Sequence, residues 1–465
     1  MNKKFDLCVI GAGPGGYVAA IQAGRAGLKT VLVEKEYLGG TCLNWGCIPT
    51  KTLIASAEVL GKIRHAADFG IKTEGKAEPD WPAMLKRKEG IVENLRKGIA
   101  ALLENSGVTV VQGTAKFADR KSVKIAKPDG KSSEIKAEKF IIACGSESLI
   151  PGFIPKSKRV LGSTELLDIK EIPKSMLILG GGVIGCEFAC LFAELGTEIT
   201  VVEMMPQILP AVDAELSKLL AREMKKKGIK VLTGTKLETV EADSKGVSAK
   251  AGKEEINADY LLVSIGRKSV TNLLDLPAAG VKINERGWIP VNSKCRTNVP
   301  TIFAIGDVTG GIQLAHLASA MADCAIENAA GKNCEFRGNL VPGCIFTSPE
   351  IGTVGLTEEQ CKEQGIKYVV GKFPFAALGK AAAINEMAGF CKIIASEETD
   401  QVLGVHIIGP HATDLISEAV VAMSLEVTAT ELGKAIHPHP TLGEAVMEAA
   451  HAVHGKSAHV MKRTV

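Results

Sequence analysis

Two cysteines, Cys42 and Cys47, stand five positions apart in the stretch GGTCLNWGCIPTK, which occupies residues 39–51. A regular α-helix would hold their Cα atoms roughly 8–9 Å apart, from ~1.5 Å of rise per residue and a ~2.3 Å radius. A disulfide needs a Cα separation of about 4.4–6.8 Å. A bond between these cysteines therefore requires a distorted backbone, which Gly46 is placed to permit. A strained and accessible disulfide is easily reduced, which suits catalysis better than structural cross-linking.

This cysteine pair has two other interpretations: the spacing could arise by chance, or the pair could be half of a metal site. Zinc sites usually combine a C-x2–4-C element with a second one, and the sequence offers no second cluster. We therefore expect no metal centre. The other cysteines are scattered, several of them within apolar segments, which is typical of buried free thiols in a reducing compartment.

A glycine-rich turn precedes the cysteine pair. The apolar segment Phe5–Ile10 leads into Gly11, Gly13 and Gly16, and a helical pattern and a second apolar strand follow, ending at Glu34. In such a turn the glycines let the backbone approach a pyrophosphate at the helix N-terminus, while the acid accepts a hydrogen bond from a ribose hydroxyl. The flanking strands and the distance to the acid predict a dinucleotide site.

The same pattern occurs a second time. Gly180, Gly182 and Gly185 follow the strand Met176–Leu179, and the next strand ends at Glu203. Two such turns imply two dinucleotides, or a duplicated fold that serves one ligand. An acid at Glu203 accepts from a free 2′-hydroxyl and repels a 2′-phosphate, which favours NAD over NADP. No arginine follows it directly to reverse that preference.

A pair of histidines lies near the C-terminus, in the segment IHPHPTLGE at residues 436–444. Histidine is the side chain best suited to acid–base chemistry near neutral pH, and a nearby carboxylate would orient it. The prolines are equally compatible with a surface turn, so the residues alone leave both interpretations open.

Length and charge limit the classes of protein that the chain can belong to. At 465 residues it should hold about three domains of roughly 150 residues each. A net charge of +3 gives no electrostatic case for nucleic-acid binding. No apolar run approaches the ~20 residues of a membrane span, and the N-terminus shows no leader pattern. We expect a soluble, cytoplasmic α/β protein.

The stretch at residues 39–51 closely resembles the redox-active disulfide motif of the flavoprotein disulfide reductases, the pyridine nucleotide-disulfide oxidoreductase family, and matching features extend from Gly11 to Glu444. The resemblance implies an α/β fold with two Rossmann-like domains, for FAD and NAD, and a C-terminal α+β dimerisation domain. The expected boundaries are 1–148 for the FAD domain, 149–273 for the NAD domain, 274–342 for a central segment that returns to the FAD domain, and 343–465 for the interface domain.

The resemblance also implies roles for individual residues. Cys42 would be the sulfur that exchanges with substrate and Cys47 the sulfur facing the flavin, while His439 would be the base and Glu444 its orienting acid. The expected FAD contacts are Gly11, Gly13, Gly16, Glu34, Lys51, Ala115, Cys144, Gly145, Ser146, Asp307, Gln313, Leu314, Ala315 and His316. The expected NAD contacts are Gly180, Gly182, Ile184, Gly185, Glu187, Glu203, Leu237 and Gly266. Cys144 departs from the family's usual threonine at a position where backbone contacts matter.

The chain looks most like the branch of this family that oxidises protein-bound dihydrolipoamide with NAD⁺. Such enzymes are homodimers in which the base of one subunit completes the site holding the other subunit's disulfide. Their partners are the lipoyl domains and acyltransferase component of 2-oxo acid dehydrogenase complexes, or the glycine cleavage system. Lys51 would stabilise negative charge near the flavin, paired with Glu187, and Ile184 would gate the nicotinamide.

Three other functions compete with this one. A glutathione-type reductase using NADPH is disfavoured by Glu203. Mercuric reductase usually carries a terminal cysteine pair, whereas the last cysteine here is Cys391. A non-catalytic flavoprotein should have lost a cysteine, the base or a glycine turn, and none is missing.

Apolar periodicity predicts further elements. Helices are expected over residues 52–65, 81–106 and 412–425. An antiparallel excursion with a return strand is expected over 108–142, and strands are expected over 343–353, 367–373, 389–395 and 402–408.

Overall fold

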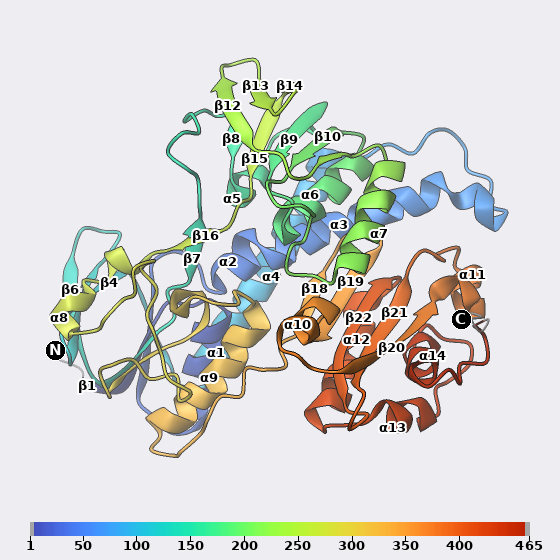
Figure 1. The fold of residues 1–465 in the computed structure, drawn as a ribbon. Helices are drawn as coiled ribbons and strands as arrows, with labels where there is room; N and C mark the ends of the chain where they lie inside the picture. Colours follow the sequence, from blue (N-terminus) through green and yellow to red (C-terminus); the bar gives the residue numbers. More distant parts are fainter. Residues whose placement is uncertain (1–3, 461–465) are drawn as a thin grey trace.

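The computed structural model describes residues 4–460, which form three lobes, each built on its own β-sheet (Figure 1). In Figure 1 the first lobe lies at the left with the N-terminus, the second at the top, and the third at the lower right with the C-terminal residues. The strand at residues 302–304 pairs with a strand of the first sheet. The first lobe is therefore assembled from two separated parts of the chain.

The first sheet has the strand order β3-β2-β1-β6-β5-β4, with β17 paired to β6. Its strands are β1 (Lys4–Ile10), β2 (Thr30–Glu34), β3 (Thr109–Gln112), β4 (Thr114–Asp119), β5 (Ser122–Ala126), β6 (Ser132–Ile142) and β17 (Ile302–Ala304). Strands β1, β2 and β17 are mostly buried, as parallel strands covered by helices on both faces must be.

Strand β6 joins an antiparallel and a parallel part of this sheet. Its first residues, Ser132–Lys136, pair antiparallel with β5, and Lys136–Ile142 pair parallel with β1. The predicted return strand is confirmed, and so is the antiparallel excursion for β4, β5 and the start of β6, whereas β3 pairs parallel with β2.

The helices of the first lobe flank this sheet. They are α1 (Pro14–Arg25), α2 (Gly40–Trp45), α3 (Cys47–Arg64), α4 (Trp81–Asn105) and α9 (Ala315–Ala329), with the short η1 (Ala66–Phe69) after α3 and η3 (Gly306–Thr309) after β17. The prediction for α4 is confirmed within one residue, and its N-cap Asp80 accepts a hydrogen bond from the backbone N–H of Ala83 at 3.0 Å. Helix α3, however, begins at Cys47 rather than at the predicted Thr52, because the helix resumes directly after Gly46.

The second lobe repeats the topology of the first. Its sheet is parallel in the order β11-β10-β9-β15-β8, beside an antiparallel sheet β12-β13-β14. The elements are β8 (Val160–Leu161), α5 (Ser163–Leu166), β9 (Ser175–Leu179), α6 (Val183–Glu194), β10 (Glu198–Val202), α7 (Ala214–Lys226), β11 (Lys230–Leu232), β12 (Leu237–Ala242), β13 (Val247–Ala251), β14 (Glu254–Ala258) and β15 (Tyr260–Val263). The unit β9-α6-β10 corresponds to β1-α1-β2, and the helices α1 and α6 each have 12 residues. A two-stranded ribbon, β7 (Ser146–Ser148) with β16 (Arg267–Ser269), lies between the lobes.

The third lobe is an antiparallel sheet, β18-β19-β22-β21-β20, covered by helices. Its elements are β18 (Gly343–Ile345), β19 (Glu350–Gly355), α10 (Glu358–Glu363), β20 (Tyr368–Pro374), α11 (Gly379–Ala383), β21 (Phe390–Ser396), β22 (Val402–Gly409), α12 (Ala412–Ser424), α13 (Ala429–Lys434) and α14 (Glu444–Val453). The single strand predicted over 343–353 is wrong. The structure has two antiparallel strands there, because the chain reverses at Phe346–Pro349, where the Ser348–Pro349 bond is cis. The other strand predictions and the helix at 412–425 are confirmed.

A buried lysine joins the second and third lobes. The side chain of Lys392, on β21, is 1% exposed, and its Nζ lies 2.9 Å from Oδ2 of Asp213 and 3.1 Å from Oε2 of Glu215 at the start of α7. It also bonds Glu358. Burial by itself lowers the pKa of Lys392, but the carboxylates outweigh it and raise the pKa, so the lysine remains charged.

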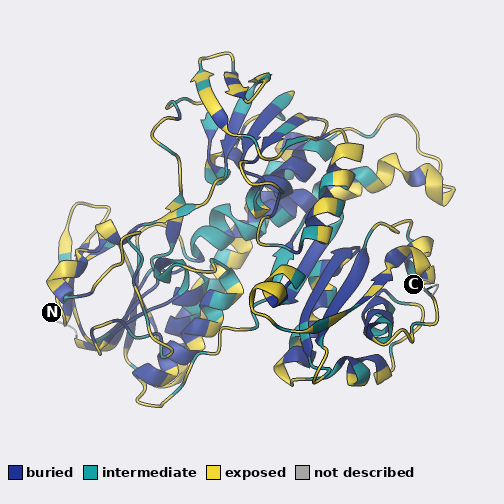
Figure 2. Cartoon of the chain, viewed as in Figure 1, coloured by how far each residue is buried: buried dark blue, intermediate teal, exposed yellow. Residues whose placement is uncertain are grey.

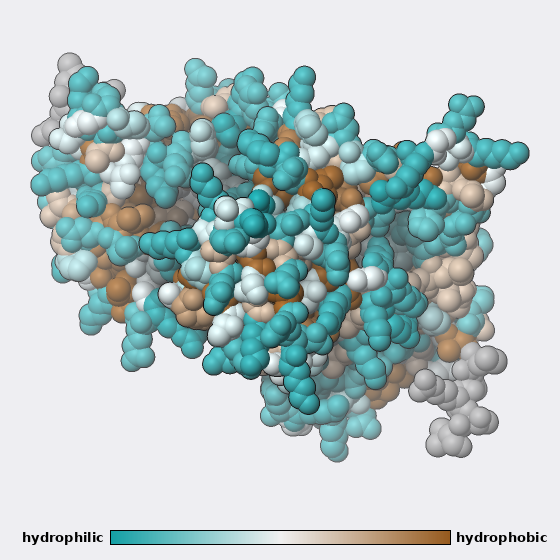
Figure 3. All heavy atoms as spheres, turned by 90° about the horizontal axis from the view of Figure 1, so that it is seen from above, coloured by the Kyte–Doolittle hydropathy of each residue, from teal (hydrophilic) through white to brown (hydrophobic). Residues whose placement is uncertain are grey.

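Burial follows the three sheets, whose strands are mostly dark blue in Figure 2, whereas the extension at the end of α3 is largely exposed. Figure 3 shows hydrophilic side chains over most of one face, with apolar atoms visible in the hollows between them. Within residues 4–460, no helix combines the length and apolarity that crossing a membrane requires.

Candidate active site

Cys42 and Cys47 lie on opposite sides of a helix break. Cys42 is in α2, Cys47 is the first residue of α3, and Gly46 separates the two helices. A Cβ at Gly46 would lie 2.8 Å from the carbonyl oxygen of Thr41 and 3.3 Å from Cα of Cys42, so only glycine allows α2 to approach this closely. Both cysteines have free thiols, and each thiol shifts the pKa of the other. The prediction that Gly46 permits the distortion is confirmed.

The thiol pair has asymmetric acidity. The neighbouring Cys42 thiol lowers the pKa of Cys47 to about 7; burial opposes this shift, and the positive charge of Lys51 supports it. The neighbouring Cys47 and partial burial raise the pKa of Cys42. When the pair loses a proton near neutral pH, the negative charge therefore resides on Cys47.

Lys51 is held beside the cysteines by the second lobe. Its Nζ lies 2.8 Å from both carboxylate oxygens of Glu187 on α6, whose side chain is buried. Glu187 also accepts from the backbone N–H of Phe346 at 3.0 Å, and Lys51 Nζ lies 4.6 Å from the centroid of the Phe346 ring. All three lobes therefore meet at this lysine. Phe346 was missed by sequence reasoning because it lies in a different lobe from both Lys51 and Glu187, and no local pattern marks it.

The first glycine turn has the form that a dinucleotide requires. A Cβ at Gly16 would lie 1.9 Å from the carbonyl oxygen of Gly11, so helix α1 packs tightly on the turn, whereas the space at Gly13 is open within 4 Å. Helix α1 begins without a side-chain cap, so its N-terminal N–H groups are available to an anion. The carboxylate of Glu34 accepts from Ala12 N at 2.6 Å and retains acceptor sites for a hydroxyl.

The second turn reproduces this arrangement. A Cβ at Gly185 would lie 2.0 Å from the carbonyl oxygen of Gly180, and Gly182 faces open space at the uncapped start of α6. The carboxylate of Glu203 accepts from Gly181 N and from Met205 N, both at 2.7 Å. The donor groups, the room and the acids at both turns fit dinucleotide pyrophosphates and riboses.

Asp307 lies in η3, directly after β17, at the edge of the first sheet. It accepts from Oγ of Ser146 at 2.6 Å, and Arg267 lies 3.6 Å from the same carboxylate oxygen and donates to Ser146 Oγ at 2.6 Å. The structure thus brings Ser146 and Asp307 together from distant parts of the sequence. Arg267 was not among the predicted site residues, because its partners Ser146 and Asp307 lie far from it in the sequence.

The remaining predicted contacts have varied surroundings. Ala115 is buried in the core of the first lobe, and Leu237 is buried in the core of the second. Cys144 and Gly145 are half-buried after β6, and Gly266 follows β15. Gln313, Leu314 and Ala315 are half-buried at the start of α9, His316 contacts the carbonyl of Pro342 at 2.9 Å, and Ile184 is half-buried in the first turn of α6. Their contacts with ligands remain predictions.

His439 and Glu444 form the predicted pair in the third lobe. Nδ1 of His439 lies 2.9 Å from Oε1 of Glu444, and Thr441 N donates to the other oxygen at 2.8 Å. Partial burial raises the pKa of Glu444, but these hydrogen bonds and the histidine outweigh it and lower the pKa overall. The side chain of His439 is 77% exposed, whereas His437 is buried against Glu418 at 2.7 Å. Nε2 of His439 therefore faces outward, free to take a proton from another molecule.

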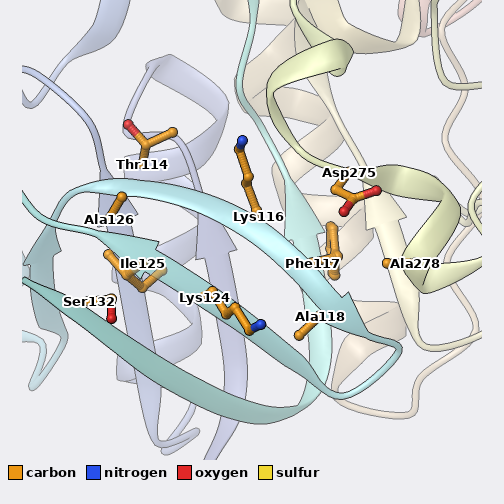
Figure 4. Close-up of a pocket in the computed structure, with 10 residues that line it drawn as sticks. All are labelled: Thr114, Lys116, Phe117, Ala118, Lys124, Ile125, Ala126, Ser132, Asp275 and Ala278. Carbon is orange, nitrogen blue, oxygen red and sulfur yellow. The ribbon is translucent and has the colours of Figure 1, made fainter.

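A cavity of about 370 Å³ lies away from these groups, on β4, β5 and α8 (Leu276–Ala279) of the first lobe (Figure 4). Lys116, Lys124 and Asp275 line it. None of the residues that line this cavity is a predicted site residue, so shape by itself does not locate the active site.

The chain belongs to the pyridine nucleotide-disulphide oxidoreductase family, whose model matches residues 5–322, and the dimerisation domain of that family matches residues 341–450. The fold is therefore that of the flavoprotein disulfide reductases, with dinucleotide-binding lobes and a C-terminal dimerisation domain.

Among curated proteins the chain is 47% identical to dihydrolipoyl dehydrogenase of Chlamydia muridarum over 456 residues, 97% of each chain. Among solved structures it is similar to LpdA of Mycobacterium tuberculosis, with a TM-score of 0.89 and 27% identity over 96% of this chain and 99% of that one. It is about equally similar to the Cu(II) complex of RclA, an HOCl-induced flavoprotein disulfide reductase of Escherichia coli, with a TM-score of 0.88 and 29% identity over 96% and 99%. The fold thus does not distinguish between branches of the family.

Proposed function

We propose that this protein oxidises dihydrolipoamide on lipoyl domains and reduces NAD⁺ to NADH, the reaction of a dihydrolipoyl dehydrogenase. The observation that carries the proposal is the pair of Cys42 and Cys47 on the two sides of the break at Gly46, with Lys51 in the same helix as Cys47 and held by Glu187. The 47% identity to a curated dihydrolipoyl dehydrogenase supports this branch of the family over the others.

The first half of the reaction is thiol–disulfide exchange. His439 Nε2, with its ring oriented by Glu444 through Nδ1, takes the proton of one substrate thiol. The resulting thiolate attacks Cys42 of the oxidised pair, and Cys47 leaves as the thiolate. The second substrate thiol attacks the mixed disulfide and releases Cys42. Lipoamide departs, and its two electrons remain on the reduced cysteine pair.

The second half returns the pair to its oxidised form. Glu34, Ser146 and Asp307 would help to hold FAD at the first glycine turn, where it would supply two-electron transfer between the dithiol and NAD⁺. Lys51 stabilises the Cys47 thiolate during this step, and Glu187 holds the lysine in place. Glu203, at the second turn, selects NAD⁺ by accepting from its 2′-hydroxyl.

We further propose a homodimer in which His439 of one copy serves the cysteines of the other. The exposure of His439 and the match to a dimerisation domain support this arrangement.

We also propose that the FAD, NAD, central and interface segments span residues 1–148, 149–273, 274–342 and 343–465. The partners would be lipoyl domains and an acyltransferase component. The scattered free thiols favour a reducing, cytoplasmic location.

Formation of NADH by the purified protein with dihydrolipoamide and NAD⁺ tests this proposal. Turnover should be lost in Cys47→Ser and retained in Cys334→Ser, which removes a half-buried thiol outside the site. A flavin-containing protein that turns over only with NADPH and glutathione disulfide, or with Hg²⁺, would reject the lipoamide assignment.

A further inference from the structure

Helix α2 carries Cys42 but has little intrinsic stability. It has six residues, and it begins without a side-chain cap after Gly39 and ends at Gly46. Gly39 and Gly40 have φ angles of 94° and 57°. A helix this short does not form by itself in water, so contacts from elsewhere in the fold must hold it.

Asn44 attaches α2 to its surroundings. Its Nδ2 donates to the carbonyl oxygens of Leu38 at 3.0 Å and Gly40 at 2.9 Å. Its Oδ1 accepts from Nε of Arg96 at 3.1 Å and from Nη2 of Arg96 at 2.8 Å. Both donors and both lone pairs of this amide are therefore used, which fixes the rotation of α2 about its own axis.

Arg96 reaches this amide from α4, 52 positions further along the chain. Its guanidinium carbon lies 4.2 Å from the centroid of the Tyr37 ring, and that ring meets Trp45, the last residue of α2, edge-on at 6.2 Å. Arg96 is half-buried and makes no salt bridge with any residue in the range 4–460. Because the guanidinium of Arg96 bonds a neutral amide and no carboxylate, its contribution is to orient the Asn44 side chain and not to neutralise a charge.

We propose that Arg96 is a positioning residue: through Asn44 and Tyr37 it fixes α2 so that Cys42 faces both Cys47 and the incoming substrate thiolate. This inference deepens the proposed function and rests on it for the identity of the substrate. The charges nearest the thiol pair are Lys51 and Glu187. Arg96 therefore acts through geometry, and its removal should alter exchange at Cys42 without removing charge stabilisation at Cys47.

The test compares Arg96→Met and Arg96→Lys with Arg87→Met. Arg87 lies on the same helix and donates to Thr52 O at 3.1 Å and Ser56 Oγ at 3.5 Å, so it contacts α3 rather than α2. Two measurements need no lipoamide: the rate of Cys42 alkylation in the reduced enzyme, and the reduction potential of the disulfide against a glutathione buffer. The third is kcat with dihydrolipoamide, together with KM for dihydrolipoamide and for NAD⁺.

In Arg96→Met the rate of Cys42 alkylation should change by several-fold and kcat should fall by about 10–100-fold, as expected for a displaced reacting group, while KM for NAD⁺ stays constant. Arg96→Lys, which cannot bond in a bidentate manner, should fall between Arg96→Met and wild type, and Arg87→Met should match wild type. Wild-type alkylation and potential in both Arg96 variants would overturn the inference. If Arg96→Met does not fold, an alkylation rate and a reduction potential at their wild-type values in Arg96→Lys would by themselves overturn the inference. Failure of lipoamide as substrate would affect only the third measurement, so the two proposals fail separately.

Discussion

Replacement of Gly46 by alanine tests whether the break between α2 and α3 creates the redox pair. The added Cβ would lie 2.8 Å from the Thr41 carbonyl oxygen, whereas ordinary contact begins at 3.4 Å, so the two helices must separate by roughly 0.6 Å. The three nearest atoms, Thr41 O, Thr41 C and Cys42 Cα, all belong to the α2 backbone and cannot turn aside. The displacement therefore moves Cys42 away from Cys47.

The magnitude follows from this overlap. Crowding of this kind costs about 1–3 kcal/mol. If the disulfide form carries this strain, its reduction becomes more favourable by the same free energy. At about 30 mV per 1.4 kcal/mol, the reduction potential of the disulfide then rises by roughly 20–65 mV. The rate at which dihydrolipoamide reduces the enzyme should change by about tenfold or more.

Stopped-flow reduction and equilibration with a glutathione buffer measure the two quantities. Gly90→Ala on α4 is the matched control, because its Cβ would meet nothing within 4 Å. A Gly46→Ala enzyme with wild-type potential and wild-type reduction rate would refute the reasoning.

Three further predictions concern charges. In the reduced enzyme the Cys47 thiolate should appear as pH rises through about 7, because Lys51 lowers the pKa of Cys47. Lys51→Met should therefore move this titration to higher pH. Ultraviolet absorbance of the thiolate measures the midpoint, and an unchanged midpoint would contradict the role of Lys51. Glu203→Ala leaves two backbone N–H groups without an acceptor, at about 1–3 kcal/mol each, so KM for NAD⁺ should rise about tenfold or more while reduction by dihydrolipoamide stays at the wild-type rate. Lys392→Met leaves the buried carboxylate of Asp213 without its lysine and should destabilise the protein by about 3–5 kcal/mol in thermal or denaturant unfolding. Lys250→Met, at a surface pair, is the control and should have little effect.

The sequence predicted those parts of the site whose physical cause is local. The glycine turns, the acids after the second strands and the break at Gly46 depend on backbone conformation within a few residues, and the structure has them where the pattern placed them. Two local predictions were wrong. Helix α3 begins at Cys47 rather than at Thr52, and the strand expected over 343–353 reverses into a hairpin. In both cases apolar periodicity gave no signal of the boundary.

The sequence by itself determined the chemistry that is available: a thiol pair, two dinucleotide turns and a histidine with an acid five positions later. Only the tertiary structure decided how these groups are held. The pair of Lys51 and Glu187 was expected from the family resemblance alone, and the structure adds Phe346 from the third lobe. Arg96 reaches Asn44 from a helix 52 residues away. Such contacts depend on how whole elements pack, and no local pattern in the sequence encodes the partner of a polar side chain.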